Sequence, residues 1–467
     1  MGKRRALAQR REIVGHSQET LARLVGVEPT TVGRWERGET FLQPWCRPKL
    51  ADALGVSVEE LDTMLAEGQP VHDGRSRSSE PRGNGELLGS DAAEELPLDP
   101  EHDPVLAPPW SHRGTVEVAV VLRGGDRPVK RRGFGFLTGM ALTAPAHQWL
   151  VHEPGPLVSG LSGRRVSPGL ADRLLALVPE LRAMDDVAGG GTVLSLAEQE
   201  FGVITELLNH ASYGEPAGRT LHVALAELGQ LAGWAAYDSG QPGLAQRYYV
   251  AALRAAHSAD DRLLGAHILG SMAYQAARGG CPGEAVTLVD TAVVGVRGRG
   301  TAGLLTALYS RQAYALASLG DSSGCAAAIS KTRTHVERLN RDDEPPYLYW
   351  VGPAEVTAGA GRCLLQLEKA DQAVTMLEDG IALFEESFIR DRRNYLIRLA
   401  EALAHPGPQR DLDAAARHGT AALDLSETLD STRGVGRLRD LYRHMKPHAK
   451  VPAVQDFVER TRGWVAV

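Results

Sequence analysis

The side chains best suited to recognise another molecule are gathered in residues 17–38, SQETLARLVGVEPTTVGRWERG. Thr30 and Thr31 begin a predicted helix there, and Arg34 follows one turn later. Arg can bind the edge of a guanine through two hydrogen bonds, and Thr can hydrogen-bond a base or contact a thymine methyl group. A helix whose first turns present these groups fits the major groove of DNA. The alternative is that they form only the solvated face of a helix.

Helix caps and apolar residues in the same region predict the short helices that position these groups. Ser17 is a typical N-cap before QETLARLV, Gly26 is a typical end of that helix, and Pro29 suits the first turn of the next. The segments RPKLADALG and SVEELDTML predict a fourth and a fifth helix. The residues expected to pack the first helices together are Leu21, Ala22, Val25, Val27, Val32 and Trp35.

Charge is distributed unevenly along the chain. The net charge of −7 argues against a protein that coats nucleic acid. Residues 1–50, however, hold ten Lys or Arg and five Glu, a net charge of +5. A small basic module on an acidic body can place DNA affinity at one end, although a chance fluctuation of charge is the alternative. Within this module, Lys3, Arg4 and Arg5 form a basic arm that either contacts phosphate or the minor groove or is simply solvated.

Residues 5–66 resemble the XRE-type regulators, the helix-turn-helix family of lambda repressor and Cro. The resemblance rests on Gln18 at the start of the second helix, the Ala22 and Gly26 positions, the VGRWERG ending and the LADALGVSVEEL tail. It implies a lambda-repressor-like domain that binds double-stranded DNA. A dimer of such domains would place two recognition helices in successive major-groove faces, and its operator would be palindromic.

The resemblance also implies which residues contact DNA. The residue matching Gln18 usually contacts backbone phosphate and neighbouring bases, and those matching Pro29, Thr30 and Arg34 usually face base edges. Pro29 replaces the polar residue common at its position, so its contact is limited to van der Waals packing. Glu36 is similar to a family carboxylate that pairs with an Arg of the first helix, here Arg11. The predicted DNA-binding residues are Lys3, Arg4, Arg5, Gln18, Pro29, Thr30, Thr31, Arg34 and Arg37.

Residues 69–194 separate this module from the rest of the chain. Residues 69–110 contain seven Pro, four Gly, nine acidic residues and three Arg, a composition that predicts a flexible linker. Residues 111–194 read as a helical connector, although periodicity cannot separate strand from helix in TVEVAVVLRGG. The segment KRRGFGFLTGMALTAPA looks like a twin-arginine export signal, but its place after a complete module favours a buried helix. The glycine-rich AGGGT lacks the Lys-Ser/Thr that completes a phosphate loop.

Residues 195–467 predict a series of helix pairs. Gly240, Gly280 and Gly320 are spaced by 40 residues, each in a turn between two helices. The second helix of each pair carries a small residue, which is Ala245, Ala285 or Ala326. Small residues at fixed positions let paired helices approach closely, as in an α-solenoid. The units resemble tetratricopeptide repeats (TPRs), although their period exceeds the usual length of about 34 residues.

A solenoid of helix pairs forms a concave groove suited to a peptide, a protein segment or a small molecule. Bacterial regulators that join an XRE-type head to TPR-like repeats commonly sense such signals and dimerise through the repeats, and the chain resembles a group common in actinobacteria. The candidate groove residues are polar or aromatic ones in the Ala-rich first helices, positions where Tyr is also standard repeat packing. They are Trp234, Tyr237, Tyr274, Gln275, Arg311, Gln312 and Tyr314.

Several classes of protein are disfavoured by the sequence. It contains neither a nucleophile elbow nor zinc-ligand spacing, and its four cysteines are scattered, so we expect no enzyme activity, no metal and no cofactor. Without a run of about 18 apolar residues, a membrane span is not expected. The excess of Arg over Lys and the abundance of Ala and Gly suggest a bacterial cytoplasmic protein associated with the nucleoid.

Together these features predict an all-α chain with a five-helix DNA-binding domain at 1–68, a linker at 69–110, a connector at 111–194 and TPR-like repeats at 195–467. The expected function is sequence-specific transcription regulation, with the repeats serving dimerisation or the sensing of a peptide, protein or small molecule. The alternative is a TPR-like interaction scaffold whose head is a protein adaptor. Salt-dependent affinity of the head for DNA would favour the regulator.

Overall fold

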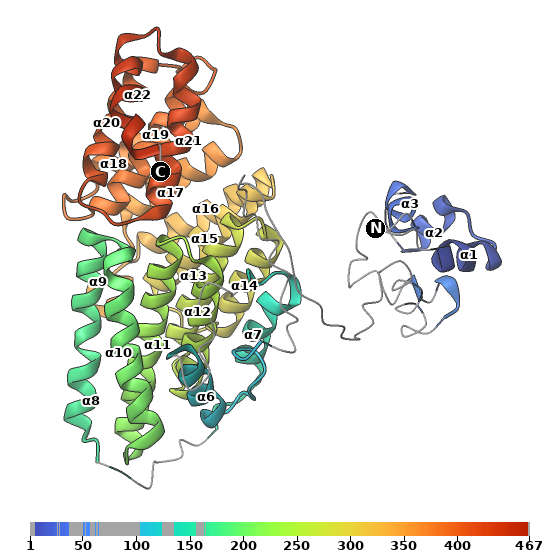
Figure 1. Ribbon diagram of the computed structural model, residues 1–467, viewed down its shortest axis with the longest axis vertical. Helices are drawn as coiled ribbons and strands as arrows, with labels where there is room; N and C mark the ends of the chain where they lie inside the picture. The colour runs from blue at the N-terminus through green and yellow to red at the C-terminus, as the bar shows by residue number, and fades with distance from the viewer. Residues whose placement is uncertain are drawn as a thin grey trace, which may run out of the picture. The chain divides into compact units, whose positions relative to one another are not determined.

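The computed structural model describes residues 5–25, 27, 29–36, 50–51, 53–56, 61, 64, 103–123, 135–155, 163 and 165–465. Within these residues every regular element is a helix, apart from one isolated β-bridge between Arg165 and Ser212, so the predicted all-α class is confirmed. The chain divides into two compact units, Met1–Ala92 and Ala93–Val467, which we call the head and the body (Figure 1).

The head contains three described helices, α1 (Arg5–Ile13), α2 (Gln18–Val25) and α3 (Pro29–Glu36). Ser17 caps α2 as predicted, because its Oγ accepts a hydrogen bond of 3.0 Å from the backbone N–H of Thr20. Most of the predicted fourth and fifth helices lies outside the described residues. The buried core consists of Leu7, Leu21, Ala22, Val25, Val32, Trp35, Leu50, Ala51, Leu54 and Leu61. Val27, which we expected to be buried, is only partly so.

The body is built from helices packed in consecutive pairs (Figure 1). Its first helices are α6 (His112–Arg123), α7 (Gly139–Val151), α8 (Pro168–Leu175), α9 (Leu177–Ala188) and α10 (Gly190–His210). The repeating pairs follow, as α11 (Glu215–Asp238) with α12 (Pro242–Ser258), α13 (Arg262–Arg278) with α14 (Pro282–Gly295), α15 (Ala302–Ser318) with α16 (Ser322–Val336), α17 (Pro353–Gln366) with α18 (Ala370–Ala382), and α19 (Ile389–Ala404) with α20 (Leu412–Ser426). The described part of the body ends with α21 (Thr432–Met445) and α22 (Pro452–Val465), and short 3₁₀ turns lie at Arg341–Asp343, Pro346–Leu348 and Lys446–His448.

The turn inside each pair repeats one backbone conformation. Gly240, Gly280 and Gly320 have φ of 80°, 83° and 77°, the left-handed region that favours glycine. The residue after each glycine donates its backbone N–H to a carbonyl five residues earlier in the first helix, which is the Schellman ending of a helix. In the fourth pair the same place is taken by Glu368, at φ 59°. The turns predicted from the glycine spacing are therefore present, and the fourth copy keeps the turn without the glycine.

Small residues at the pair interfaces only partly follow the expected spacing. Ala245 and Ala285 are fully buried on α12 and α14, but Ala326 is exposed on α16. The buried position of that pair is held by Cys325, because a period of 40 residues counted from residue 285 leads to residue 325. The prediction of Ala326 as the third buried small residue is therefore wrong by one position, and Cys325 takes that place.

The segment predicted as a connector is part of the body core. The ambiguous apolar run forms α6, which packs on α10 and α12, and its buried residues recur with helical spacing. Trp149 of α7 is fully buried in the same core. The interruption expected at Pro179 lies between α8 and α9 at Ala176, because Pro is tolerated in the first turn of a helix.

Residues 103–110, at the end of the predicted linker, also pack against the body. Asp103 is completely buried and accepts hydrogen bonds from Nε and Nη2 of Arg247 at 3.0 and 2.7 Å. The carbonyls of Pro108 and Pro109 accept hydrogen bonds from Arg254. The packed body thus begins before residue 111.

Helices from the two ends of the body meet, with α9 against α19 and α11 against α21. Between them, the N–H of Asp430 donates to the carbonyl of Ala188 at 2.8 Å, and the N–H of Gly191 donates to the carbonyl of Asp430 at 3.0 Å. A Cβ atom on Gly191 would lie 2.0 Å from the Asp430 carboxylate, and one on Gly190 would lie 2.7 Å from the Ala235 carbonyl. The glycines of AGGGT therefore permit this close approach.

Candidate nucleic-acid interface and central cavity

A buried ion pair fixes the helix-turn-helix region of the head. Nε of Arg11, on α1, donates to Oε1 of Glu36, on α3, at 2.6 Å, and both side chains are about nine-tenths buried. The amide of Gln18, at the start of α2, donates to the other Glu36 oxygen at 2.7 Å. The hydrogen bond between Arg11 and Glu36 raises the pKa of Arg11. The expected pairing of Arg11 with Glu36 is confirmed, and its carboxylate joins all three helices.

Six of the nine predicted DNA-contacting residues belong to the described helices of the head. Gln18 is exposed at the start of α2, and Thr31 is partly buried in the first turn of α3. Pro29, Thr30 and Arg34 belong to α3 and Arg5 begins α1, but the side chains of these four are outside the described atoms. Lys3, Arg4 and Arg37 fall outside the described residues.

A cavity of about 100 Å³ is lined by α9, by the first helices of the pairs, by the turn at 347–350 and by α21. Seven arginines and three carboxylates line it, together with six aromatic residues that include Trp234 and Tyr274. The charged side chains are Arg182, Arg311, Arg362, Arg390, Arg398, Arg433, Arg437, Asp185, Glu355 and Asp391. With all of these ionised, the wall carries four more positive than negative charges.

Only some of the predicted groove residues reach this cavity. Trp234, Tyr274 and Arg311 line it. Tyr237 contacts the rings of Trp234 and Tyr274 but does not line it. The remaining three residues are engaged elsewhere: Gln275 donates to the Pro242 carbonyl at 2.7 Å, Gln312 donates to Asp290 at 2.6 Å, and Tyr314 accepts from Arg278 at 3.4 Å.

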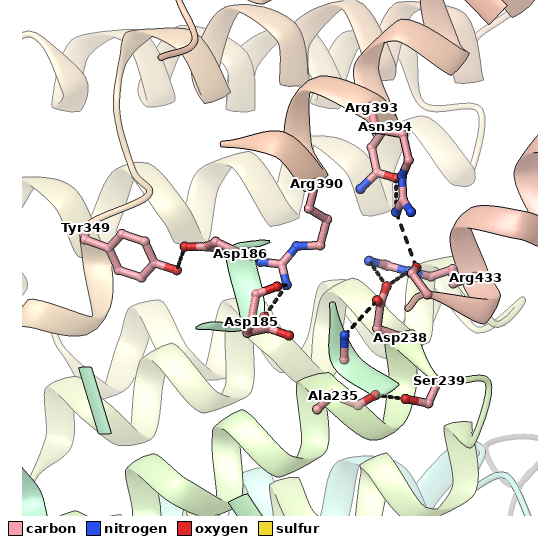
Figure 2. A network of polar contacts seen from close by, with 12 residues as sticks. Asp185, Asp186, Ala235, Asp238, Ser239, Tyr349, Arg390, Arg393, Asn394 and Arg433 are labelled. Atoms are coloured by element: carbon pink, nitrogen blue, oxygen red, sulfur yellow. Dashed lines mark hydrogen bonds and ion pairs between the residues drawn. The ribbon is translucent and has the colours of Figure 1, made fainter. Parts of the chain in front are cut away.

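Two ion-pair sites hold the end helices together next to the cavity (Figure 2). Arg433 of α21 donates through Nε and Nη2 to one oxygen of Asp238 on α11, at 3.0 and 2.9 Å. Arg390 of α19 bridges the neighbouring carboxylates of Asp185 and Asp186 on α9, with 2.7 Å to the latter. We call these contacts the clasp, since they join residues about 200 positions apart in sequence.

Several arginines of the cavity wall are buried without complete hydrogen bonding. Among the described residues, Nε and Nη2 of both Arg362 and Arg437 have no hydrogen-bond partner, although these side chains are only 4% and 9% exposed. Nη1 of Arg433 is likewise unpartnered within that set. Cation–π contacts with aromatic rings stabilise two of the wall's arginines in part. The Arg362 guanidinium lies 4.9 Å from the Tyr314 ring centroid, and the Arg311 guanidinium lies 4.5 Å from the Tyr274 ring centroid.

The clustered guanidinium groups create a positive potential inside the cavity. Burial lowers the pKa of Arg437 to about 9, and repulsion from Arg278 and Arg398 adds to the effect. Burial alone would raise the pKa of Tyr274, yet the guanidinium groups that surround it, beginning with Arg278, lower it well below its usual value. The site therefore favours negative charge.

Most of the charged cavity wall was missed by sequence reasoning. Arg390, Asn394 and Arg398 recur at spacings of four residues on α19, and Arg433 and Arg437 do so on α21. This spacing places each set on one helix face. A charged helix face is ordinarily solvated. The spacing was therefore visible in the sequence, but it did not indicate that these side chains line a cavity.

Residues 4–64 match the family model of a helix-turn-helix domain, whereas no curated protein matches the chain. None of the helices in the described part of the chain is long and apolar enough to cross a membrane. Within the same residues, no group of three His, Cys, Asp or Glu side chains is arranged to hold a metal ion. The chain therefore carries a helix-turn-helix domain at its N-terminal end, followed by a helical body that contains an arginine-rich cavity.

Proposed function

We propose that the chain is a sequence-specific DNA-binding transcriptional regulator of the XRE type that acts at the bacterial nucleoid. The observation that carries the proposal is the helix-turn-helix match at residues 4–64, over a head whose three described helices share one buried core. The α3 helix starts with Pro29, Thr30 and Thr31, groups suited to a major-groove surface. The positive balance of residues 1–50 supports attraction to phosphate.

The body, in this proposal, is the part of the regulator that receives a signal and joins two chains into a homodimer. A concave wall of first helices is the usual place for a ligand in a helical-repeat protein. A ligand changes DNA affinity only if it binds one arrangement of the heads better than the other. It acts either on the distance between the two heads or on the amount of dimer.

The proposal is tested by sequencing the genomic fragments that bind the purified full-length protein at near-physiological salt. We expect a short inverted repeat to be enriched, since a dimer presents two recognition helices related by a twofold axis. Replacing Arg34 with Ala should remove the enrichment, because loss of a base contact costs about 1–3 kcal/mol. The matched control is Arg113→Ala, which removes the same charge from a side chain that is 91% exposed in the body.

Two results would contradict the proposal. One is identical enrichment by wild type and Arg34→Ala, which would show that α3 does not read the sequence. The other is the absence of enrichment both in buffer and after addition of cell extract, which supplies a missing co-ligand. In that second case, a protein that co-purifies with the head would instead favour the adaptor alternative.

A further inference from the structure

The central cavity has the chemistry of an anion site. Its wall combines an excess of four positive charges with two arginines, Arg362 and Arg437, that are at least nine-tenths buried and incompletely hydrogen-bonded within the described structure. Leaving a buried charged donor unsatisfied is costly, and proteins rarely retain such groups without a use for them. The arrangement is therefore best explained by a bound partner that supplies the missing acceptors.

The geometry of the two guanidinium groups indicates what the partner carries. Each has two unpartnered N–H-bearing atoms, Nε and Nη2, on one edge of its plane. That edge matches the pair of oxygens of a carboxylate or phosphate, which it binds through two parallel hydrogen bonds. Two such edges and the further unpartnered Nη1 of Arg433 require more oxygens than a monocarboxylate offers.

Asp185 and Glu355 neutralise these arginines only in part. Asp185 pairs with Arg390 as part of the clasp. The carboxylate of Glu355 lies 3.9 Å from both Arg311 and Arg362, and it also accepts a hydrogen bond from Tyr395 at 2.7 Å. One carboxylate shared between two guanidinium groups leaves a net positive charge beside it.

The small volume of the cavity limits the size of the partner. Helices from both ends of the body line it, and α9 and α11 are joined to α19 and α21 by the clasp (Figure 2). A protein segment would need a long groove, whereas a volume of about 100 Å³ suits a small ionised group. This favours a small molecule over a peptide.

We propose that the central cavity binds a small organic polyanion, with two or more negative charges on phosphate or carboxylate oxygens, and that Arg362 and Arg437 are its principal ligands. This ligand class would be the signal of the regulator proposed above. Binding of the anion does not depend on that proposed function; only an effect of the anion on DNA binding rests on it. Because the ligand would contact Arg362 of α17 and Arg437 of α21, it would also link these two helices.

The test is isothermal titration calorimetry of the full-length protein with two probes, sodium pyrophosphate and sodium citrate, at constant ionic strength. Phosphate and carboxylate oxygens are thereby compared directly. We expect saturable binding of at least one probe, and a weakening of about tenfold or more in Arg362→Met and in Arg437→Met. Arg113→Met, which removes an exposed guanidinium, should retain the wild-type affinity within about twofold.

Controls separate loss of the site from loss of the fold. Each variant is checked by circular dichroism, and Arg437→Lys, which keeps the charge but not the two-pronged edge, is expected to fall between wild type and Arg437→Met. The proposal is overturned if wild type binds neither probe at up to about 10 mM, or if Arg362→Met and Arg437→Met bind as wild type does. DNA binding is measured separately on the same proteins, so that failure of the regulator proposal is not mistaken for failure of the anion site.

Discussion

Replacing Asp238 with Asn should open the clasp. Asp238 is completely buried, and its carboxylate pairs with Arg433 at 2.9 Å while accepting a long hydrogen bond of 3.4 Å from the N–H of Gly190. The amide keeps the size of the side chain but removes its charge, so a buried guanidinium is left without its counter-ion. Removal of one partner from a buried pair costs about 3–5 kcal/mol.

The expected change in melting temperature follows from the size of the body. Unfolding entropy of about 2.1 cal/mol/K per residue gives roughly 0.8 kcal/mol/K for residues 93–467. The loss of about 3–5 kcal/mol therefore lowers the melting temperature by about 4–6 °C. Differential scanning calorimetry measures this change, and hydrogen exchange should become faster at the backbone amides of Gly191 and Asp430, which bond across the clasp.

A matched control is Asp424→Asn. Asp424 pairs with Arg460 at 2.5 Å, but both side chains are about half exposed, so the loss should be at most about 1 kcal/mol. Burial opposes ionisation of Asp238, but the charges of Arg433 and Arg390 outweigh it and lower the pKa of Asp238. The contribution of Asp238 to stability is therefore present above the ordinary pKa of an Asp and is lost as the pH falls through the lower pKa of the folded state. Equal melting temperatures for Asp238→Asn and wild type near neutral pH would refute the clasp as a stabilising feature.

Three further results are expected. Glu36→Gln should lower the free energy of unfolding of the head by about 3 kcal/mol, because Arg11 loses its buried counter-ion, and hydrogen exchange in α1–α3 would report it. Glu368→Gly should raise the free energy of unfolding by about 0.5 kcal/mol, because glycine relieves the strain at φ 59° by more than its greater freedom in the unfolded chain costs. Gly320→Ala should lower the free energy of unfolding, and a urea titration measures both changes. Burial raises the pKa of Asp186 to about 6, so its folded form holds the proton more tightly and stability should increase as the pH falls from about 6 towards 4. Asp186→Asn should lack this part of the pH dependence in thermal melts, and an unchanged dependence would show that another group causes it.

Local features of the body could be predicted from the sequence because their causes are local. A left-handed glycine ends a helix whatever surrounds it, so the spacing of Gly240, Gly280 and Gly320 was sufficient to place the turns. In the head, the caps and the apolar spacing similarly predicted α2 and α3, and the resemblance to a known family supplied the pair of Arg11 with Glu36.

The cavity could not be predicted, because it exists only once the ends of the body meet. Arg390 and Arg433 have the spacing and composition of a solvated helix face, and only the contacts with α9 and α11 bury them. The glycines 189–191 were recognised as unusual, but their reason is the approach of Asp430, which is distant in sequence. Pairings of this kind depend on the curvature of the whole helix series, which no short window of residues records.

The clasp also fixes how many helix pairs the body can contain. In an open solenoid each repeat contacts only its neighbours, so a copy can be inserted or deleted at little cost to the others. Here Arg390 and Arg433 must return to the carboxylates of α9 and α11, and one pair more or fewer between them would carry those arginines past their partners. Descendants of this chain are thus expected to vary in loops and surface residues while keeping the pair count constant, and lineages that did change the count would have to abandon the clasp and the cavity together.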